Sequence, residues 1–237
     1  YFFVHRADLH DALVRAVRLR GRAFDARQSA ERDPAGSWPA AWDASGRTAA
    51  DGRVAELVET IHRPVVEALA TRETPFIGCL YAGLMRTPDG PRVLEFNCRF
   101  GDPETQPIMC RLRSDLPALC EAALDGRLDQ VRMDWDPRAA VGVVMAAGGY
   151  PDDVRKGDEI HGLDAAAKMP GKVFHAGTTL NADGKVVTNG GRVLCAVGLG
   201  STVRAAQKQA YELAGTICWE GLQYRKDIGF RAIARES

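Results

Sequence analysis

The sequence predicts an α+β fold, and three observations lead to that prediction. Two apolar runs, PFIGCLYAGLMR and RVLEFNCRF, flank the turn-forming sequence TPDGP, so residues 75–100 are expected to form an antiparallel hairpin. Further short strands occupy residues 172–200, followed by an amphipathic helix. Strands and helices alternate without a regular βαβ repeat, which favours the α+β class.

Residues 1–53 form a divergent amino-terminal segment that is expected to be poorly ordered. Residues 8–21 can form a helix, because their apolar side chains recur on one face: Leu9, Leu13, Val14 and Val17. Residues 27–52 are rich in Gly, Pro and Ser and lack periodicity, which is typical of a loop or tail.

Residues 54–137 are expected to form the next zone, opening with a helix that Pro64 kinks. The apolar stripe of this helix is Val54, Leu57, Val58, Ile61, Val65 and Leu69. In the hairpin that follows, Gly78 and Gly83 suggest close approach by other backbone. Residues 105–126 then predict one broken helix or two, with Ser114 and Asp115 as a restart cap and Gly126 as a stop.

Residues 138–237 are expected to form a carboxy-terminal α+β domain. AAVGVVMAAGGYP predicts a buried strand, and Asp183-Gly184 predicts a hairpin turn. Ser201 is expected to cap the helix over residues 201–219, and residues 228–234 (IGFRAIA) are predicted to be the last strand. The inward face of the helix is expected to consist of Val203, Ala206, Ala210, Leu213 and Ile217.

Composition and charge exclude several classes of function. The 237 residues carry 31 basic and 31 acidic side chains, so no electrostatic footprint for nucleic acid or an anionic membrane is visible. No apolar run reaches the roughly 20 residues that a membrane span needs. The six cysteines form no C-x-x-C pair, and buried free thiols in a reducing compartment are expected. The cytoplasm is therefore the expected location; because the chain does not begin with Met, it is read as a processed form or a fragment.

The stretch VLEFNCRFGDPETQP, residues 93–107, carries the candidate chemistry. Side chains alternate along a strand, so Leu94, Phe96 and Cys98 are expected to point into the core. Glu95, Asn97 and Arg99 then point to the other face, where Glu95 and Asn97 are about 7 Å apart at the backbone. A carboxylate and an amide oxygen at that spacing suit Mg²⁺, which takes its remaining ligands from water and phosphate oxygens.

Three further charged groups lie close to this pair in the sequence. The guanidinium of Arg99 can hold a phosphoryl oxygen or a carboxylate. Asp102 and Glu104 open a helix, where they can cap it or bind an ammonium group of a substrate. The alternative is an exposed polar face of an edge hairpin followed by a capped helix, and spacing alone leaves both readings open.

Other chemical motifs are not found. The sequence has neither a G-x-x-x-x-G-K-[ST] phosphate loop nor a G-x-G-x-x-G fingerprint. The five histidines are scattered without metal-ligand spacing, and His175 is read as an ordinary, partly buried histidine rather than a catalytic one. Gly190-Gly191 is read as a turn rather than a phosphate cradle.

The collinear stretches FIGCLYAGLM, VLEFNCRFGDPETQPIM, DPRAAVGVVMAAGGYP, VFHAGT, TNGGRVLC and YRKDIGFRAIARE resemble the phosphoribosylamine–glycine ligases of the ATP-grasp superfamily. The resemblance covers about residues 75–236 and implies the carboxy-terminal half of an ATP-grasp domain followed by a small α+β domain. It implies that glycine and ATP form glycyl phosphate, which 5-phosphoribosylamine attacks to give glycinamide ribonucleotide, ADP and phosphate.

The resemblance also implies roles for individual residues. Glu95 and Asn97 match the metal ligands of the family's E-F-N motif, which bind Mg²⁺ or Mn²⁺. Arg99 matches the arginine that clamps the transferring phosphoryl group, a role of positioning and electrostatics. Asp102, Pro103 and Glu104 match the D-P-E loop beside the substrate site.

Residues 1–53 depart from the family. The Rossmann-like domain, the Lys-bearing pieces that hold ATP and the P-N-T-G-G-M-G stretch are not found, and the Arg- and Ala-rich texture resembles a degenerate, misassembled or frame-shifted segment. The chain alone is thus expected to bind ATP weakly and to have little or no ligase activity. The alternative is a non-catalytic remnant that binds metal or a partner chain supplying the missing lobe. Another ATP-grasp ligase with a different acid is disfavoured by the motifs past Arg138.

Overall fold

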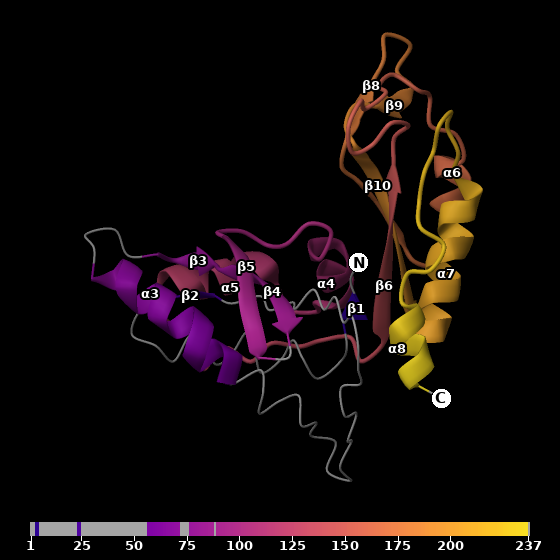
Figure 1. The fold of residues 1–237 in the computed structure, drawn as a ribbon. Coiled ribbons are helices and arrows are strands. Elements are labelled where there is room, and N and C mark those ends of the chain that lie inside the picture. Colours follow the sequence, from indigo (N-terminus) through magenta and orange to yellow (C-terminus); the bar gives the residue numbers. More distant parts are fainter. Residues whose placement is uncertain (1–2, 5–22, 25–55, 72–75, 88, 237) are drawn as a thin grey trace. The chain divides into compact units, whose positions relative to one another are not determined.

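A computed structural model describes residues 3–4, 23–24, 56–71, 76–87 and 89–236, which form two compact units (Figure 1). One unit comprises Phe3, Pro103–Arg111 and the chain from Pro137 onward. The other comprises the described residues from Val4 to Asp102, together with Leu112–Asp136. The mixture of helices and strands confirms the α+β class. The helix expected over residues 8–21, the loop over 27–52 and Val54 lie outside the described residues.

The carboxy-terminal unit is built on a four-stranded sheet in the order β1-β6-β10-β7. These strands are β1 (Phe3–Val4), β6 (Ala139–Ala146), β10 (Arg192–Gly200) and β7 (Lys172–His175). The long strands β6 and β10 run antiparallel, and β7 pairs antiparallel with β10. Strands β8 (Thr178–Leu180) and β9 (Val186–Thr188) form a separate hairpin, and Gly184 at φ 75° confirms the predicted turn.

Both faces of this sheet are covered, which is why β6 and β10 are almost continuously apolar. Helix α7 (Val203–Thr216) lies along β6 and β10 and buries one face (Figure 1). Helix α4 (Thr105–Arg111) packs on β6 and β10 as well, where Cys110 contacts the cluster of Ala140, Cys195 and Val197. A Cβ at Gly142 of β6 would lie 3.0 Å from Pro107 Cγ, so the glycine makes room for α4.

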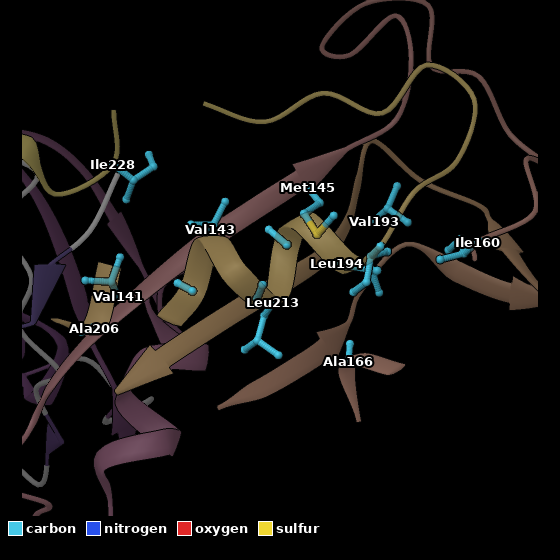
Figure 2. Close-up of a cluster of buried hydrophobic side chains, with 14 of the residues drawn as sticks. Val141, Val143, Met145, Ile160, Ala166, Val193, Leu194, Ala206, Leu213 and Ile228 are labelled. Atoms are coloured by element: carbon cyan, nitrogen blue, oxygen red, sulfur yellow. The ribbon is translucent and has the colours of Figure 1, made fainter. Parts of the chain in front are cut away.

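The main core lies between α7 and the sheet (Figure 2). The five predicted inward residues of the helix are all at most 2% exposed, which confirms the stripe: Val203, Ala206, Ala210, Leu213 and Ile217. They pack against Val141, Val143 and Met145 of β6, each 0% exposed. The helix approaches β10 closely, because a Cβ added at Gly198 would overlap Ala206 O and Ala210 N.

The amino-terminal end of α7 is fixed by side chains. Thr202, not the predicted Ser201, is the amino-terminal cap, and its Oγ1 accepts a hydrogen bond from Ala205 N over 3.1 Å. The Glu236 carboxylate accepts a further bond from Val203 N over 2.6 Å.

The predicted last strand over residues 228–234 is wrong: Phe230–Arg235 form helix α8 after Gly229, whose φ is 80°. The apolar residues of this short segment are too few to distinguish the two-residue period of a strand from the 3.6-residue period of a helix. A one-turn helix, α6 (Leu163–Ala166), was not predicted.

In the second unit a π-helical turn, η2 (Val58–His62), runs into α3 (Arg63–Ala70). Pro64, expected to kink the helix, sits in the first turn of α3, where a missing N–H costs little. The irregularity lies just before it, in the π turn. Val66 and Leu80 form a small core with Val65 and Phe76.

The predicted hairpin is confirmed as β4 (Tyr81–Thr87) and β5 (Gly90–Asn97). A separate pair joins β2 (Ala23–Phe24) and β3 (Gly78–Cys79) in parallel. Helix α5 (Leu116–Leu124) starts at the predicted cap, since Asp115 Oδ1 accepts from Ala118 N over 2.9 Å, and Gly126 follows its end. The short helix η3 (Leu128–Gln130) completes the unit. In the described ranges no helix combines the length and apolar character that crossing a membrane requires.

Candidate functional site on the β4–β5 hairpin

The register of the hairpin sets the geometry of the candidate site. Tyr81 lies opposite Asn97, and Gly83 lies opposite Glu95. The next pair is Leu84 with Val93, so Leu94 is an extra residue and β5 carries a bulge directly beside Glu95. Bulges redirect neighbouring side chains and are common next to active sites.

The two predicted metal ligands, Glu95 and Asn97, lie together on one face of β5. Asn97 Nδ2 donates a hydrogen bond to Glu95 Oε1 over 3.0 Å, in an exposed position. The predicted sharing of a face is therefore confirmed by direct contact. The atoms in contact are the amide nitrogen and a carboxylate oxygen, and the pair also carries the two kinds of oxygen, carboxylate and amide, that suit a hard cation.

The other face of β5 is less buried than expected. Leu94 is 60% exposed and Cys98 is also exposed, so the prediction that they point into the core is wrong. Phe96 does contact the second unit's helical segment, since its ring meets the His62 ring edge-on at 6.5 Å, yet it stays 39% exposed. The bulge breaks the alternation at Leu94, and in the described residues β5 pairs with β4 alone.

Arg99 lies beyond the end of the strand, not on it. β5 ends at Asn97, and Cys98 and Arg99 form a bend, so strand alternation does not fix the direction of Arg99. Its Nη1 donates to the carbonyl of Phe100 over 2.8 Å, and the side chain is exposed. In the described part of the chain no hydrogen bond or ion pair joins Arg99 to Glu95 or Asn97. The structure thus brings the two predicted metal ligands together, whereas the Arg99 side chain is bonded to the backbone carbonyl of the next residue.

The Asp102-Pro103-Glu104 loop leads into α4. Asp102 is exposed, Pro103 is half-buried and Glu104 is only 3% exposed. The carbonyl of Glu104 accepts the first helical bond, from Ile108 N over 3.2 Å. The division between the two units falls between Asp102 and Pro103, so Asp102 belongs to the unit of the hairpin and Glu104 to the other. Of the two carboxylates only Asp102 faces solvent in this conformation.

A metal ion here would need ligands from outside the protein. Among the described residues no group of three or more His, Cys, Asp or Glu side chains is arranged to hold an ion. Glu95 and Asn97 supply two oxygen donors, which fits a cation that keeps several waters and takes phosphate oxygens. The donor set fits Mg²⁺ or Mn²⁺ better than a softer metal.

Thiols and histidines away from the hairpin do not add to this site. The structure contains no disulfide between the six cysteines; Cys79 and Cys195 are buried as expected, whereas Cys98, Cys120 and Cys218 are exposed. Burial raises the pKa of the Cys110 thiol to about 11. His175 is exposed, not partly buried, and its Nδ1 lies 3.1 Å from Thr178 Oγ1.

One residue of the site was seen in the sequence but assigned another role. Gly83 was expected to allow another backbone segment to approach closely. Instead, the atoms nearest to a Cβ placed there belong to Glu95, with Cγ at 3.1 Å. The signal was available, because counting back from the TPDGP turn places Gly83 near Glu95. The bulge at Leu94 shifts that count by one, and nothing local in the sequence announces it.

Family comparisons match two parts of the chain. The model described as the phosphoribosylglycinamide synthetase ATP-grasp (A) domain matches residues 44–105, which include the hairpin. The model described as the C domain of the same synthetase matches residues 140–231. The first match begins at residue 44, earlier than the expected start of the resemblance near residue 75. The expectation that all of residues 1–53 depart from the family is therefore wrong for residues 44–53.

The three similar proteins described next are all named phosphoribosylamine–glycine ligase. The chain is 58% identical over 181 residues to a phosphoribosylamine–glycine ligase of Vibrio parahaemolyticus, covering 76% of this chain and 42% of the relative. It is 63% identical over 169 residues to that of Pseudomonas putida, covering 71% and 39%. A crystal structure of the Thermotoga maritima ligase superposes with a TM-score of 0.59 at 38% identity, covering 73% of this chain and 42% of that one. The chain spans about two fifths of the length of the relatives it matches.

Proposed function

Because the chain belongs to the phosphoribosylamine–glycine ligase family over the residues that these comparisons cover, we propose that it serves the ATP-dependent ligation of glycine to 5-phosphoribosylamine. The reaction passes through glycyl phosphate and gives glycinamide ribonucleotide, ADP and phosphate, a step of purine biosynthesis. The substrates are small molecules, and the cytoplasm is the proposed location. The single observation that carries the proposal is the contact of Glu95 with Asn97 on a hairpin matched by the family's ATP-grasp model.

Glu95 and Asn97 are proposed to hold Mg²⁺ or Mn²⁺. Glu95 is exposed and Asn97 is half-buried beside it, so a cation that displaces the Nδ2–Oε1 contact can reach an oxygen of each while retaining open positions for phosphate oxygens. Bound there, the ion would neutralise charge on the triphosphate during phosphoryl transfer. The task of the two side chains is to fix where the phosphates lie relative to the hairpin.

Arg99 is proposed to act on the transferring phosphoryl group. Its guanidinium now donates to the Phe100 carbonyl in an exposed bend, a contact that a charged phosphoryl oxygen can displace at small cost. Asp102, exposed in the following loop, is proposed to contact the amino group of a substrate, with Pro103 and Glu104 shaping the loop. Glu104 is buried, so its proposed part is to anchor the loop at the start of α4.

A second candidate function is binding without turnover. Three large apolar side chains on β5 are exposed, Val93, Leu94 and Phe96 at 43%, 60% and 39%. Exposed apolar side chains gathered on one element favour a surface that another polypeptide covers. In this reading the chain binds metal and nucleotide phosphate and relies on a partner chain for the rest of the ATP site.

A calorimetric titration of the full chain with Mg-ATP, with and without glycine, tests the binding step common to both candidates. A heat signal that depends on Mg²⁺ and is lost in Glu95→Gln is expected, because the substitution removes the charged donor and preserves the shape. Glu121→Gln is the matched control, since it makes the same change on an exposed residue of α5 in the same unit.

Product formation separates the two candidates. Incubation of the chain with all three substrates is followed for glycinamide ribonucleotide and phosphate. Metal-dependent binding with product supports the ligase; metal-dependent binding without product supports the second candidate. A binding signal that Glu95→Gln leaves unchanged contradicts the placement of the metal in both.

A further inference from the structure

We propose that Gly83 is a positioning residue for the Glu95 carboxylate. The inference rests on the proposed function for the metal that Glu95 would hold, and on geometry alone for the position of the side chain. Gly83 touches no proposed substrate and acts only through Glu95.

The side chain of Glu95 lies across Gly83. The two residues are register partners on β4 and β5. The three atoms nearest to an ideal Cβ at position 83 all belong to Glu95: Cγ at 3.1 Å, the carbonyl oxygen at 3.7 Å and Oε1 at 3.8 Å. Oε1 is the oxygen that accepts the bond from Asn97 Nδ2. The glycine therefore borders the same carboxylate oxygen that faces the candidate metal site.

Backbone conformation does not explain the glycine at this position. Ten glycines of the described chain have positive φ, and Gly83 is not among them. A strand interior accepts any L-residue, and glycine there weakens the strand. The space occupied by Glu95 is thus the feature that favours glycine at position 83.

The bulge beside Glu95 acts in the same direction. Leu94 has no partner in the register, so β5 bends at the residue that precedes Glu95. The bend and the missing Cβ together allow the Glu95 side chain to fold back over β4 and reach Asn97. A side chain at position 83 would push Cγ of Glu95 outward and separate Oε1 from Asn97 Nδ2.

The experiment compares Gly83→Ala and Gly83→Val with Gly215→Ala in the full chain. Gly215 is a suitable control, because a Cβ there meets nothing within 4 Å and its φ is not positive. Two quantities are measured: the NMR shift of the Asn97 side-chain amide, and the affinity for Mn²⁺ from electron paramagnetic resonance. The first reports the Glu95–Asn97 contact without any metal.

We expect Gly83→Val to move the Asn97 amide resonance toward that of a free amide and to weaken Mn²⁺ binding roughly tenfold or more, the usual cost of losing ligand orientation. Gly83→Ala should give a smaller shift in the same direction, and Gly215→Ala none. Backbone resonances of Ala82 and Phe96 report whether the hairpin is intact. If the valine variant proves to be unfolded, the result for Gly83→Ala decides the question.

Two results separate failure of the inference from failure of the proposed function. An intact hairpin with the wild-type Asn97 resonance in both Gly83 variants overturns the role of Gly83. Absence of Mn²⁺ binding by the unsubstituted chain overturns the proposed metal site, while the Asn97 resonance still decides what Gly83 does.

Discussion

Asn97 and Glu95, two residues apart on β5, are joined by a hydrogen bond from Nδ2 to Oε1 over 3.0 Å. The amide thus occupies one carboxylate oxygen that a cation would otherwise bind. A neutral donor beside a carboxylate keeps the pair stable without metal, because no like charges are brought together. Binding of a cation must then exchange this contact for two coordination bonds.

Replacement of Asn97 by Asp tests that exchange. Without metal the two carboxylates repel, and we expect the hairpin to lose on the order of 0.5 kcal/mol, the scale of exposed charge pairs. With Mn²⁺ the added charge should strengthen binding, so the metal-induced rise in melting temperature should exceed that of the unsubstituted chain. Asn97→Ala should instead reduce the rise. Equal metal-induced shifts in all three proteins would place the ion elsewhere.

The amino terminus of α7 allows a test of capping with an adjacent control. Thr202→Ala removes the oxygen that accepts from Ala205 N, and we expect a loss of about 1 kcal/mol in the free energy of unfolding. Ser201→Ala changes an exposed hydroxyl one residue earlier and should change the free energy little. Urea denaturation measures both, and a larger effect at Ser201 would move the cap to the position expected from the sequence.

The close contact of α7 with β10 predicts opposite effects for two Gly→Ala changes. At Gly198 the new methyl group would overlap Ala206 O and Ala210 N, both backbone atoms, so we expect a loss of about 2 kcal/mol or more. At Gly215, in the last turn of α7, the methyl group meets nothing and should stabilise the helix by about 0.5–1 kcal/mol. Thermal unfolding monitored by circular dichroism compares them; equal melting temperatures would contradict the tight packing.

Thiol reactivity should divide the six cysteines by exposure and pKa. With its pKa raised to about 11 by burial, Cys110 holds almost no thiolate at pH 8 and should react slowly with iodoacetamide. The rate at Cys110 should still be rising between pH 9 and 11. Cys98, Cys120 and Cys218 are exposed and should be modified first, as peptide mass spectrometry can follow. Early labelling of Cys79 or Cys195 would contradict their burial.

Much of the fold could be predicted where a local signal and the final packing agree. The i, i+3, i+4 spacing that begins at Val203 and Ala206 can be read in the sequence and is satisfied by one sheet face. Asp115 and Asp183-Gly184 carry their turn chemistry within a few residues, so their roles needed no tertiary information. The sharing of a face by Glu95 and Asn97 followed from the period of a strand alone.

The predictions that fail are those for which contacts between residues distant in the sequence determine the local structure. Leu94 is exposed because a bulge set by pairing with β4 breaks the alternation that the sequence suggests. Phe230 and Ile233 suit either a strand or a helix, and the positive φ of Gly229 places them in α8. Arg99 was expected to lie on the strand, on the same face as Glu95 and Asn97, but the strand ends before it. The end of a strand depends on which backbone groups find hydrogen-bond partners, and no single residue type encodes that.

The assignment of α4 to the carboxy-terminal unit has a consequence for dividing this protein into parts. The polypeptide passes between the two units at Phe3–Val4, at Asp102–Pro103, at Arg111–Leu112 and at Asp136–Pro137. A single cut at the last of these points would leave the sheet without the helix that packs near Ala140, Cys195 and Val197. The carboxy-terminal unit is therefore discontinuous, and a gene fragment beginning at Pro137 would encode a sheet with one bare face. Transfer of this unit to another protein, by recombination or by design, requires the nine residues Pro103–Arg111 to travel with it.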